Sequence, residues 1–92
     1  MTENEISYKI RGAIYRVYNN AGPGLLESAY ESALAYELAK ENLTIRTQVG
    51  LPFVYEGIVM DNGYRVDILV EDKVIIEIKS VEQLAEVHYK QL

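Results

Sequence analysis

Three ionisable side chains placed close together in the sequence give the clearest indication of chemistry. Asp67 precedes the triplet Glu77-Ile78-Lys79, and both pieces lie in short runs of Val, Ile and Leu. Carboxylates are ligands for hard divalent cations, and a neighbouring lysine can orient a water or stabilise developing negative charge. The residue types therefore indicate metal-assisted hydrolysis of a phosphodiester.

A β-hairpin over residues 64–79 would hold these side chains, because alternate residues of a strand face opposite sides of a sheet. The even positions are all apolar and are predicted to face a core: Tyr64, Val66, Ile68, Val70, Val74, Ile76 and Ile78. The odd positions that form a second, ionisable face are Arg65, Asp67, Glu77 and Lys79. The hairpin is thus predicted to bury one face and to display charge on the other.

The strand register decides whether the acids meet. A three-residue loop at residues 71–73 would place Asp67 opposite Glu77, where like charges cost up to about 1 kcal/mol unless a cation bridges them. A loop at residues 72–74 would instead place Asp67 opposite Lys79 as an ordinary cross-strand ion pair that needs no ligand. Spacing alone leaves both registers open.

Two amphipathic helices should precede the strands. Apolar residues at helical spacing predict one helix from Glu5 to Asn19 and another from Pro23 or Leu25 to Glu41, separated by a turn rich in Asn, Gly and Pro. Glu27 falls in the first turn of the second helix, where a carboxylate stabilises the helix dipole by about 0.3–1 kcal/mol. By itself this position favours a structural role for Glu27.

The rest of the pattern is extended and then helical. The predicted strands are Thr44–Tyr55, Ile58–Met60, Tyr64–Val70 and Val74–Lys79, and a third helix is predicted at Val81–Leu92. Asn62-Gly63 is the strongest hairpin turn signal, and Pro52 indicates an edge or irregular strand. The predicted fold class is α+β, with two N-terminal helices, a mainly antiparallel sheet and a C-terminal helix.

Composition limits the remaining choices. The chain has 92 residues, of which 49% are hydrophobic and 25% charged, which fits one domain spanning residues 1–92. With no cysteine and a single histidine, disulfides and multi-histidine zinc sites are excluded. The net charge of −5 argues against nucleic-acid binding by nonspecific electrostatics alone. Without a signal-like or membrane-length apolar run, we expect a cytoplasmic protein with no membrane partner.

Several segments together resemble the GxxExxR group of the PD-(D/E)xK nuclease superfamily, and the match covers nearly the whole chain. The residues that carry it are Gly22-Pro23-Gly24-Leu25-Leu26-Glu27-Ser28-Ala29-Tyr30, Gln48, Tyr55, Tyr64-Arg65-Val66-Asp67, Glu77-Ile78-Lys79 and Val87-His88-Tyr89-Lys90-Gln91-Leu92. Tyr30 stands where the group has its arginine, and a core aromatic is expected there. Members of the group continue beyond the final Gln-Leu, so the resemblance implies a restriction-endonuclease-like core that is incomplete at its C-terminal end.

The resemblance also implies residue roles and partners. Asp67, Glu77, the Ile78 carbonyl and Glu27 would hold Mg²⁺ or Mn²⁺, Lys79 would act in catalysis with Asp67 and Glu77, and Gln91 would support the site. It favours the register that places Asp67 opposite Glu77. Nucleic acid, DNA rather than RNA, is the implied partner, and an exposed sheet edge or truncated end would promote homo-oligomers. The alternative is a catalytically silent nuclease fold used for binding or assembly.

Overall fold

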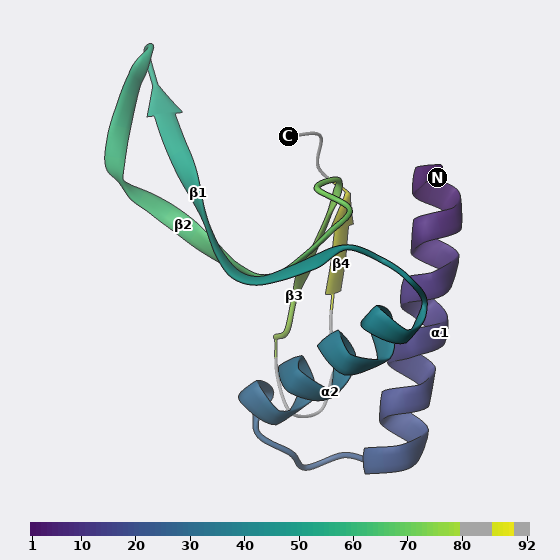
Figure 1. The fold of residues 1–92 in the computed structure, drawn as a ribbon. Coiled ribbons are helices and arrows are strands. Elements are labelled where there is room, and N and C mark those ends of the chain that lie inside the picture. The colour runs from purple at the N-terminus through teal and green to yellow at the C-terminus, as the bar shows by residue number, and fades with distance from the viewer. Residues whose placement is uncertain (80–85, 90–92) are drawn as a thin grey trace.

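Two helices pack on one antiparallel sheet in the computed structural model, which describes residues 1–79 and 86–89 (Figure 1). The elements in chain order are α1 (Glu3–Ala21), α2 (Glu27–Lys40), β1 (Ile45–Tyr55), β2 (Ile58–Val70), β3 (Val74–Glu77) and β4 (Glu86–Tyr89). The sheet has the order β1-β2-β3-β4, and each neighbouring pair is antiparallel. The predicted α+β class is confirmed.

Helix α1 begins at a capping box that links Thr2 and Glu5. The Thr2 hydroxyl accepts a hydrogen bond from the Glu5 N–H at 3.2 Å, and the Thr2 N–H donates to Glu5 Oε1 at 3.2 Å. These bonds satisfy amide groups that a helix start leaves free. The Glu5 carboxylate accepts from the Thr2 N–H and also from the Thr2 hydroxyl, and these two bonds lower its pKa. No helix among the described residues is both long and apolar enough to cross a membrane.

The turn between the helices is fixed by Tyr30. Gly22 and Gly24 have φ angles of 73° and 97°, a region that glycine adopts without steric cost. The Tyr30 hydroxyl donates to the Gly22 carbonyl at 2.6 Å and accepts from the Leu25 N–H at 3.3 Å. Its ring is buried in the core, as predicted. Tyr30 therefore sets where α2 begins, and with it the position of Glu27.

The main core lies between the helices and one face of the sheet. Helix α1 packs along α2 and against β3, while α2 contacts β1 and β2. The buried residues of this core are Ile6, Ile10, Ala13, Val17, Tyr30, Leu34, Leu38, Leu43, Ile68, Val70, Val74, Ile76 and Ile78. The prediction from strand alternation is thus confirmed for the even positions 68–78, whereas Val66 is buried outside this core and Tyr64 is exposed. Leu69 and Ile75 are also buried, in a second cluster with Val66.

The hairpin between β2 and β3 has the three-residue loop. Val70 pairs with Val74 and Ile68 with Ile76, so the loop is residues 71–73. Glu71 and Asp72 take φ angles of 54° and 53°, and the Lys73 N–H closes the turn on the Val70 carbonyl at 3.0 Å. The alternative loop at residues 72–74 is wrong.

The turn between β1 and β2 lies at Glu56-Gly57, and Asn62-Gly63 is not a turn. Tyr55 pairs with Ile58, and the two loop residues have φ angles of 50° and 79°, as a type I′ turn requires. Asn62-Gly63 sits inside β2, where the register shifts between Leu51 and Phe53. A Cβ on Gly63 would lie 2.2 Å from the Leu51 carbonyl oxygen, so this glycine permits a close backbone approach.

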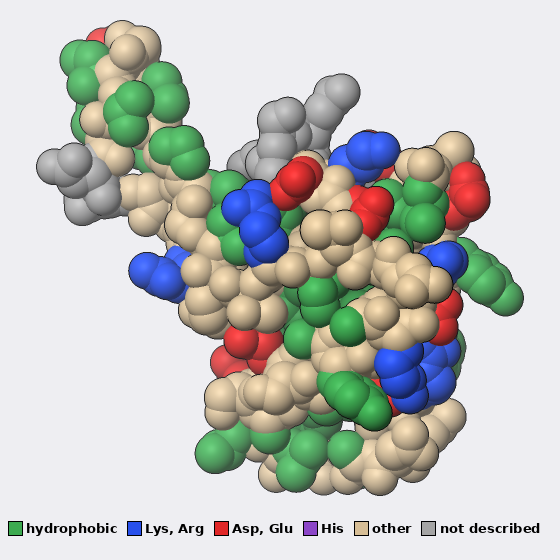
Figure 2. Space-filling view, in the orientation of Figure 1, with side chains coloured by type: hydrophobic (Ala, Val, Ile, Leu, Met, Phe, Trp, Pro, Cys, Tyr) green, Lys and Arg blue, Asp and Glu red, His purple; other side chains and the backbone are tan. Residues whose placement is uncertain are grey.

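Beyond this irregularity the β1–β2 ribbon projects from the body as an arm, residues 52–63 (Figure 1). The arm carries five large apolar side chains that are about half or more exposed: Phe53, Val54, Tyr55, Ile58 and Val59. Figure 2 shows this apolar surface standing apart from the body, where the acidic and basic side chains gather. The position of Pro52 at the irregular point of an edge strand agrees with its predicted effect.

The helix predicted for Val81–Leu92 is wrong at residues 86–89, the part of it that the structure describes. Residues 86–89 form β4 instead, with Val74 opposite Tyr89 and Glu77 opposite Glu86. The β-branched and aromatic residues of this segment suit a strand, and pairing satisfies the outer edge of β3. The other residues of that prediction, including Gln91, lie outside the described part of the chain.

Candidate functional site

The β2–β3 register brings the two predicted acids to matching positions. The pairing of Ile68 with Ile76, continued by one residue, sets Asp67 against Glu77 at the end of the hairpin. Both side chains are half-buried. This is the arrangement that the three-residue loop predicted, and it places two carboxylates where a sheet would otherwise avoid like charges.

Asp67 is held by a backbone hydrogen bond from the neighbouring segment. Its Oδ2 accepts from the Ile78 N–H at 2.8 Å. Ile78 follows the last residue of β3, and its side chain is buried in the main core. The Asp67 carboxylate is therefore anchored to the same short segment that carries Glu77 and Lys79.

A glutamine on β1 connects this pair to helix α2. Gln48 lies between the pairs Thr47–Ile68 and Val49–Val66, which puts it opposite Asp67. Its Nε2 donates to Glu31 Oε1 at 2.6 Å and lies 3.4 Å from Asp67 Oδ1. Gln48 thereby links α2, β1 and β2 at one point.

The helix acid that Gln48 contacts is Glu31. Glu27 is exposed in the first turn of α2, the position that favours a helix-dipole role. Glu31 follows it by four residues and so shares its face of the helix. Sequence reasoning missed Glu31, although its i,i+4 spacing from Glu27 was a usable signal.

Gln48 has an unusual backbone conformation. Its φ angle is 52°, a left-handed value that costs a residue with a Cβ roughly 1–2 kcal/mol. Its carbonyl accepts a hydrogen bond from Arg65 Nη1 at 3.2 Å. Outliers of this kind concentrate at functional sites, where the surrounding structure maintains them. Gln48 was part of the family resemblance, but sequence alone gave it no role.

Lys79 lies beside the acids and pairs with one of them. Its Nζ is 3.2 Å from Glu77 Oε2, and the lysine side chain is the more exposed of the two. A lysine here can donate to a negatively charged group that approaches the acids. The structure thus brings together Asp67, Glu77, Ile78 and Lys79. Glu27 lies one helical turn before Glu31 on α2.

The donor set suits a hard divalent cation. Asp67 and Glu77 offer carboxylate oxygens, and Mg²⁺ commonly binds through one or two carboxylates while keeping several waters. Within the described residues, no group of three Asp, Glu, His or Cys side chains gathers to hold a metal. The residues therefore fit a cation that completes its coordination with water or substrate oxygens, not a closed structural metal site.

Comparison with known proteins agrees with this arrangement. The sequence model described as the PD-(D/E)XK nuclease superfamily matches residues 4–92. No curated protein and no solved structure gives a significant match. Nucleases of this superfamily typically use divalent metals, and the matched residues include both acids and the lysine of the β2–β3 hairpin. The chain belongs to the PD-(D/E)XK nuclease superfamily.

Proposed function

We propose that this chain is a Mg²⁺-dependent nuclease, or a closely related DNA-processing protein, of the GxxExxR group, and that residues 1–92 act as one domain. The observation that carries the proposal is the β2–β3 register, whose pair Ile68–Ile76 is followed directly by Asp67 on one strand and Glu77 on the other, with Lys79 3.2 Å from Glu77. Such a pair of acids is stabilised when a cation lies between them. We infer DNA in preference to RNA as the substrate.

The protein groups have separate roles in this proposal. Asp67, Glu77, the Ile78 carbonyl and Glu27 would hold Mg²⁺ or Mn²⁺, which would supply Lewis-acid activation of water and phosphate. Lys79 donates to the phosphate oxygen on which negative charge grows. Gln48 holds the Asp67 carboxylate through its amide, and Glu31 holds Gln48. Gln91 is proposed to support the site from the C-terminal segment.

Cleavage of labelled DNA and RNA oligonucleotides tests the catalytic part. The intact chain should cut DNA with Mg²⁺ or Mn²⁺ and not with EDTA, and Lys79→Ala should lower the rate at least a hundredfold. Lys73→Ala is the matched control, because Lys73 is a lysine of the same hairpin whose Nζ donates to the Met1 carbonyl and not to either acid of the site. Absence of cleavage by the intact chain under all these conditions would refute the nuclease proposal.

A second candidate is a catalytically silent nuclease fold that serves in binding or assembly. Two observations favour it: the acid cluster holds fewer than three metal-ligand side chains in the described part of the chain, and the apolar arm offers a contact surface. Calorimetric titration with Mn²⁺ separates the two. Metal binding that Asp67→Asn abolishes, together with cleavage, supports the enzyme. The absence of both metal binding and cleavage supports the silent fold.

A further inference from the structure

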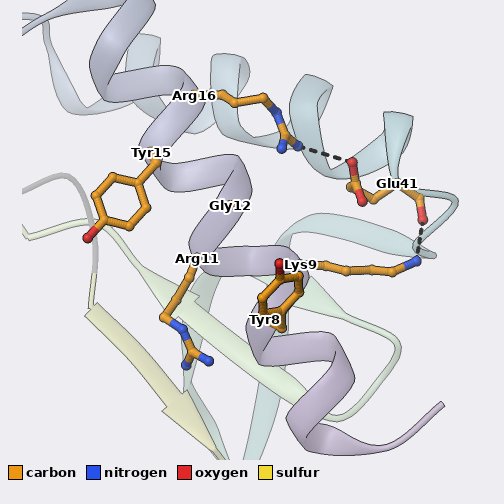
Figure 3. A pocket seen from close by; sticks show the side chains of 7 residues that line it. All are labelled: Tyr8, Lys9, Arg11, Gly12, Tyr15, Arg16 and Glu41. Atoms are coloured by element: carbon orange, nitrogen blue, oxygen red, sulfur yellow. Dashed lines mark hydrogen bonds and ion pairs between the residues drawn. The ribbon is translucent and has the colours of Figure 1, made fainter.

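The outer face of α1 carries tyrosines where a helix facing solvent needs none. Tyr8 and Tyr15 are 75% and 68% exposed, and they lie on the side of α1 away from its buried residues Ile6, Ile10 and Val17. Figure 3 shows the Tyr15 ring extending away from the helix, and Arg11 lies between Tyr8 and Tyr15 in sequence. Core packing therefore does not explain these rings.

A groove of about 460 Å³ runs along this face. The side chains that line it come from α1 and from the end of α2: Tyr8, Lys9, Arg11, Gly12, Tyr15, Arg16 and Glu41 (Figure 3). A second hollow of about 400 Å³ continues it past Arg11 and Tyr15 to Tyr18. The volume is in the range of sites that hold a small organic group such as a base with its sugar.

The three cations that line this groove differ in whether a carboxylate lies near them, and Arg16 has two, Glu37 at 2.7 Å and Glu41 at 3.3 Å. Lys9 donates to the Glu41 carbonyl at 3.2 Å and also lies near the Glu5 carboxylate, whose pKa it helps to lower. Arg11 makes no ion pair with any residue that the structure describes. Arg11 therefore offers the groove a positive charge that no described carboxylate pairs with, on a chain whose net charge is −5.

Gly12 keeps the groove open between the two tyrosines. A Cβ at this position would meet nothing closer than Arg16 Nη1 at 3.4 Å, which is an ordinary contact. Packing therefore does not require glycine here, although glycine in the middle of a helix is unfavourable relative to alanine. Its effect on the surface is to leave the floor of the groove bare.

We propose that this groove binds single-stranded nucleic acid, with bases stacked on Tyr8 and Tyr15 and phosphates paired with Arg11 and Lys9. Aromatic faces alternating with cations are how proteins hold single strands without reading sequence. An acidic peptide would use the cations but not the two exposed rings. The groove lies on a different element from Asp67 and Glu77, so this contact goes beyond the proposed cleavage site and does not depend on catalysis.

Fluorescence anisotropy with a labelled single-stranded dT oligonucleotide tests the proposal. We would use the full chain carrying Asp67→Asn, with EDTA present, so that cleavage cannot alter the probe. Tyr8→Ala and Tyr15→Ala should each weaken binding at least fivefold, as expected for loss of a stacked base. Tyr36→Ala is the matched control, because Tyr36 is an exposed tyrosine on α2.

Two further measurements test the phosphate contacts and the shape of the groove. With two phosphate contacts, the slope of log K against log salt should be about −1.4, and Arg11→Gln should reduce its magnitude by about 0.7. Gly12→Leu should fill the groove and weaken binding while circular dichroism shows the helix intact. Binding unaffected by the tyrosine variants, or equal binding of a poly-glutamate peptide, would overturn the proposal.

Failure of the groove proposal can be told apart from failure of the nuclease proposal. If the oligonucleotide binds through the groove but the intact chain cleaves nothing, only the nuclease proposal fails. If the intact chain cleaves and Tyr8→Ala changes neither binding nor cleavage of single strands, only the groove proposal fails.

Discussion

At the scale of single residues, Gln48 combines a backbone cost with a side-chain role. Its left-handed φ of 52° is unfavourable, yet its amide joins Glu31 to Asp67. These two properties can be separated by substitution, because glycine removes both the amide and the steric cost, whereas alanine removes only the amide.

We predict that Gln48→Gly is more stable than Gln48→Ala by about 1 kcal/mol, the steric cost of a Cβ in the left-handed region. Urea unfolding followed by circular dichroism measures the difference. Thr47→Gly and Thr47→Ala form the control pair, because Thr47 lies within regular pairing of the same strand and alanine should there be the more stable variant. Equal stability of the two Gln48 variants would contradict the prediction.

Loss of the Gln48 amide should also weaken the metal site. Groups that orient a metal ligand typically contribute 10–100-fold in affinity. We therefore predict that Gln48→Ala binds Mn²⁺ at least tenfold more weakly than the unmodified chain, measured by calorimetry. Gln48→Gly should lose the same affinity, because it lacks the same amide. Unchanged Mn²⁺ affinity in both variants would show that Gln48 does not support the acids.

Two of the acids near the site could be predicted from sequence, and a third, Glu31, could not. The prediction that Asp67 and Glu77 lie at matching positions required only the loop length, because the loop length sets the strand register and alternation sets the face on which each side chain lies. Glu31 could not be found in the same way, because its approach to Gln48 depends on how α2 is placed over β1. That placement is set by long-range packing and by the Tyr30 hydrogen bonds at the helix start.

At the scale of elements, α1 and α2 are joined by a charged cluster around Glu37. Its Oε1 lies 2.7 Å from Arg16 Nε and 3.2 Å from Lys40 Nζ, and the carboxylate is largely buried. The Arg16 hydrogen bond, with a smaller effect of Lys40, holds the pKa of Glu37 below its usual value of 4.5. The folded state therefore favours the ionised carboxylate.

Helix pairing should consequently weaken in acid. A carboxyl with a lowered folded pKa stabilises the protein above its unfolded pKa, and this contribution is lost as pH falls from about 4.5 through the lower folded value. We predict that the stability difference between the unmodified chain and Glu37→Gln is largest near pH 7 and shrinks below pH 4.5. Urea midpoints across this range measure it, with Glu56→Gln as a control outside the cluster. A pH-independent difference would contradict the assignment.

Local signals for elements failed where tertiary contacts opposed them. Asn62-Gly63 has the composition of a hairpin turn, yet Glu56-Gly57 makes the turn and Gly63 is needed where its backbone closely approaches Leu51. The spacing of apolar residues predicted a helix at residues 86–89, but these residues form a strand because the open edge of β3 offers hydrogen-bonding partners. The existence of the two N-terminal helices was predicted because their apolar stripes are long and match one buried face, although α2 begins at Glu27 and not at Pro23 or Leu25.

At the scale of the whole molecule, the arm makes the protein more extended than its length requires. The radius of gyration is 13.8 Å, whereas about 12 Å is expected for a compact chain of this length. The arm is a two-stranded ribbon, which is marginally stable alone, and it exposes apolar side chains with Glu56 as the single charge between residues 52 and 60. Such a surface requires no complementary charge, so a second copy of the same arm can cover it.

We therefore predict concentration-dependent self-association through the arm. Val59 is 65% exposed and pairs with Val54, so Val59→Lys should place a charge in the contact at little cost to the monomer. In sedimentation velocity, the weight-average sedimentation coefficient of the unmodified chain should rise with concentration, and that of Val59→Lys should remain flat. Leu26→Lys is the matched control, because it replaces an exposed apolar residue outside the arm and changes the net charge equally. If Leu26→Lys abolishes association as fully as Val59→Lys does, the association depends on net charge and not on the arm. An unmodified chain that stays monomeric at all concentrations would refute association through the arm.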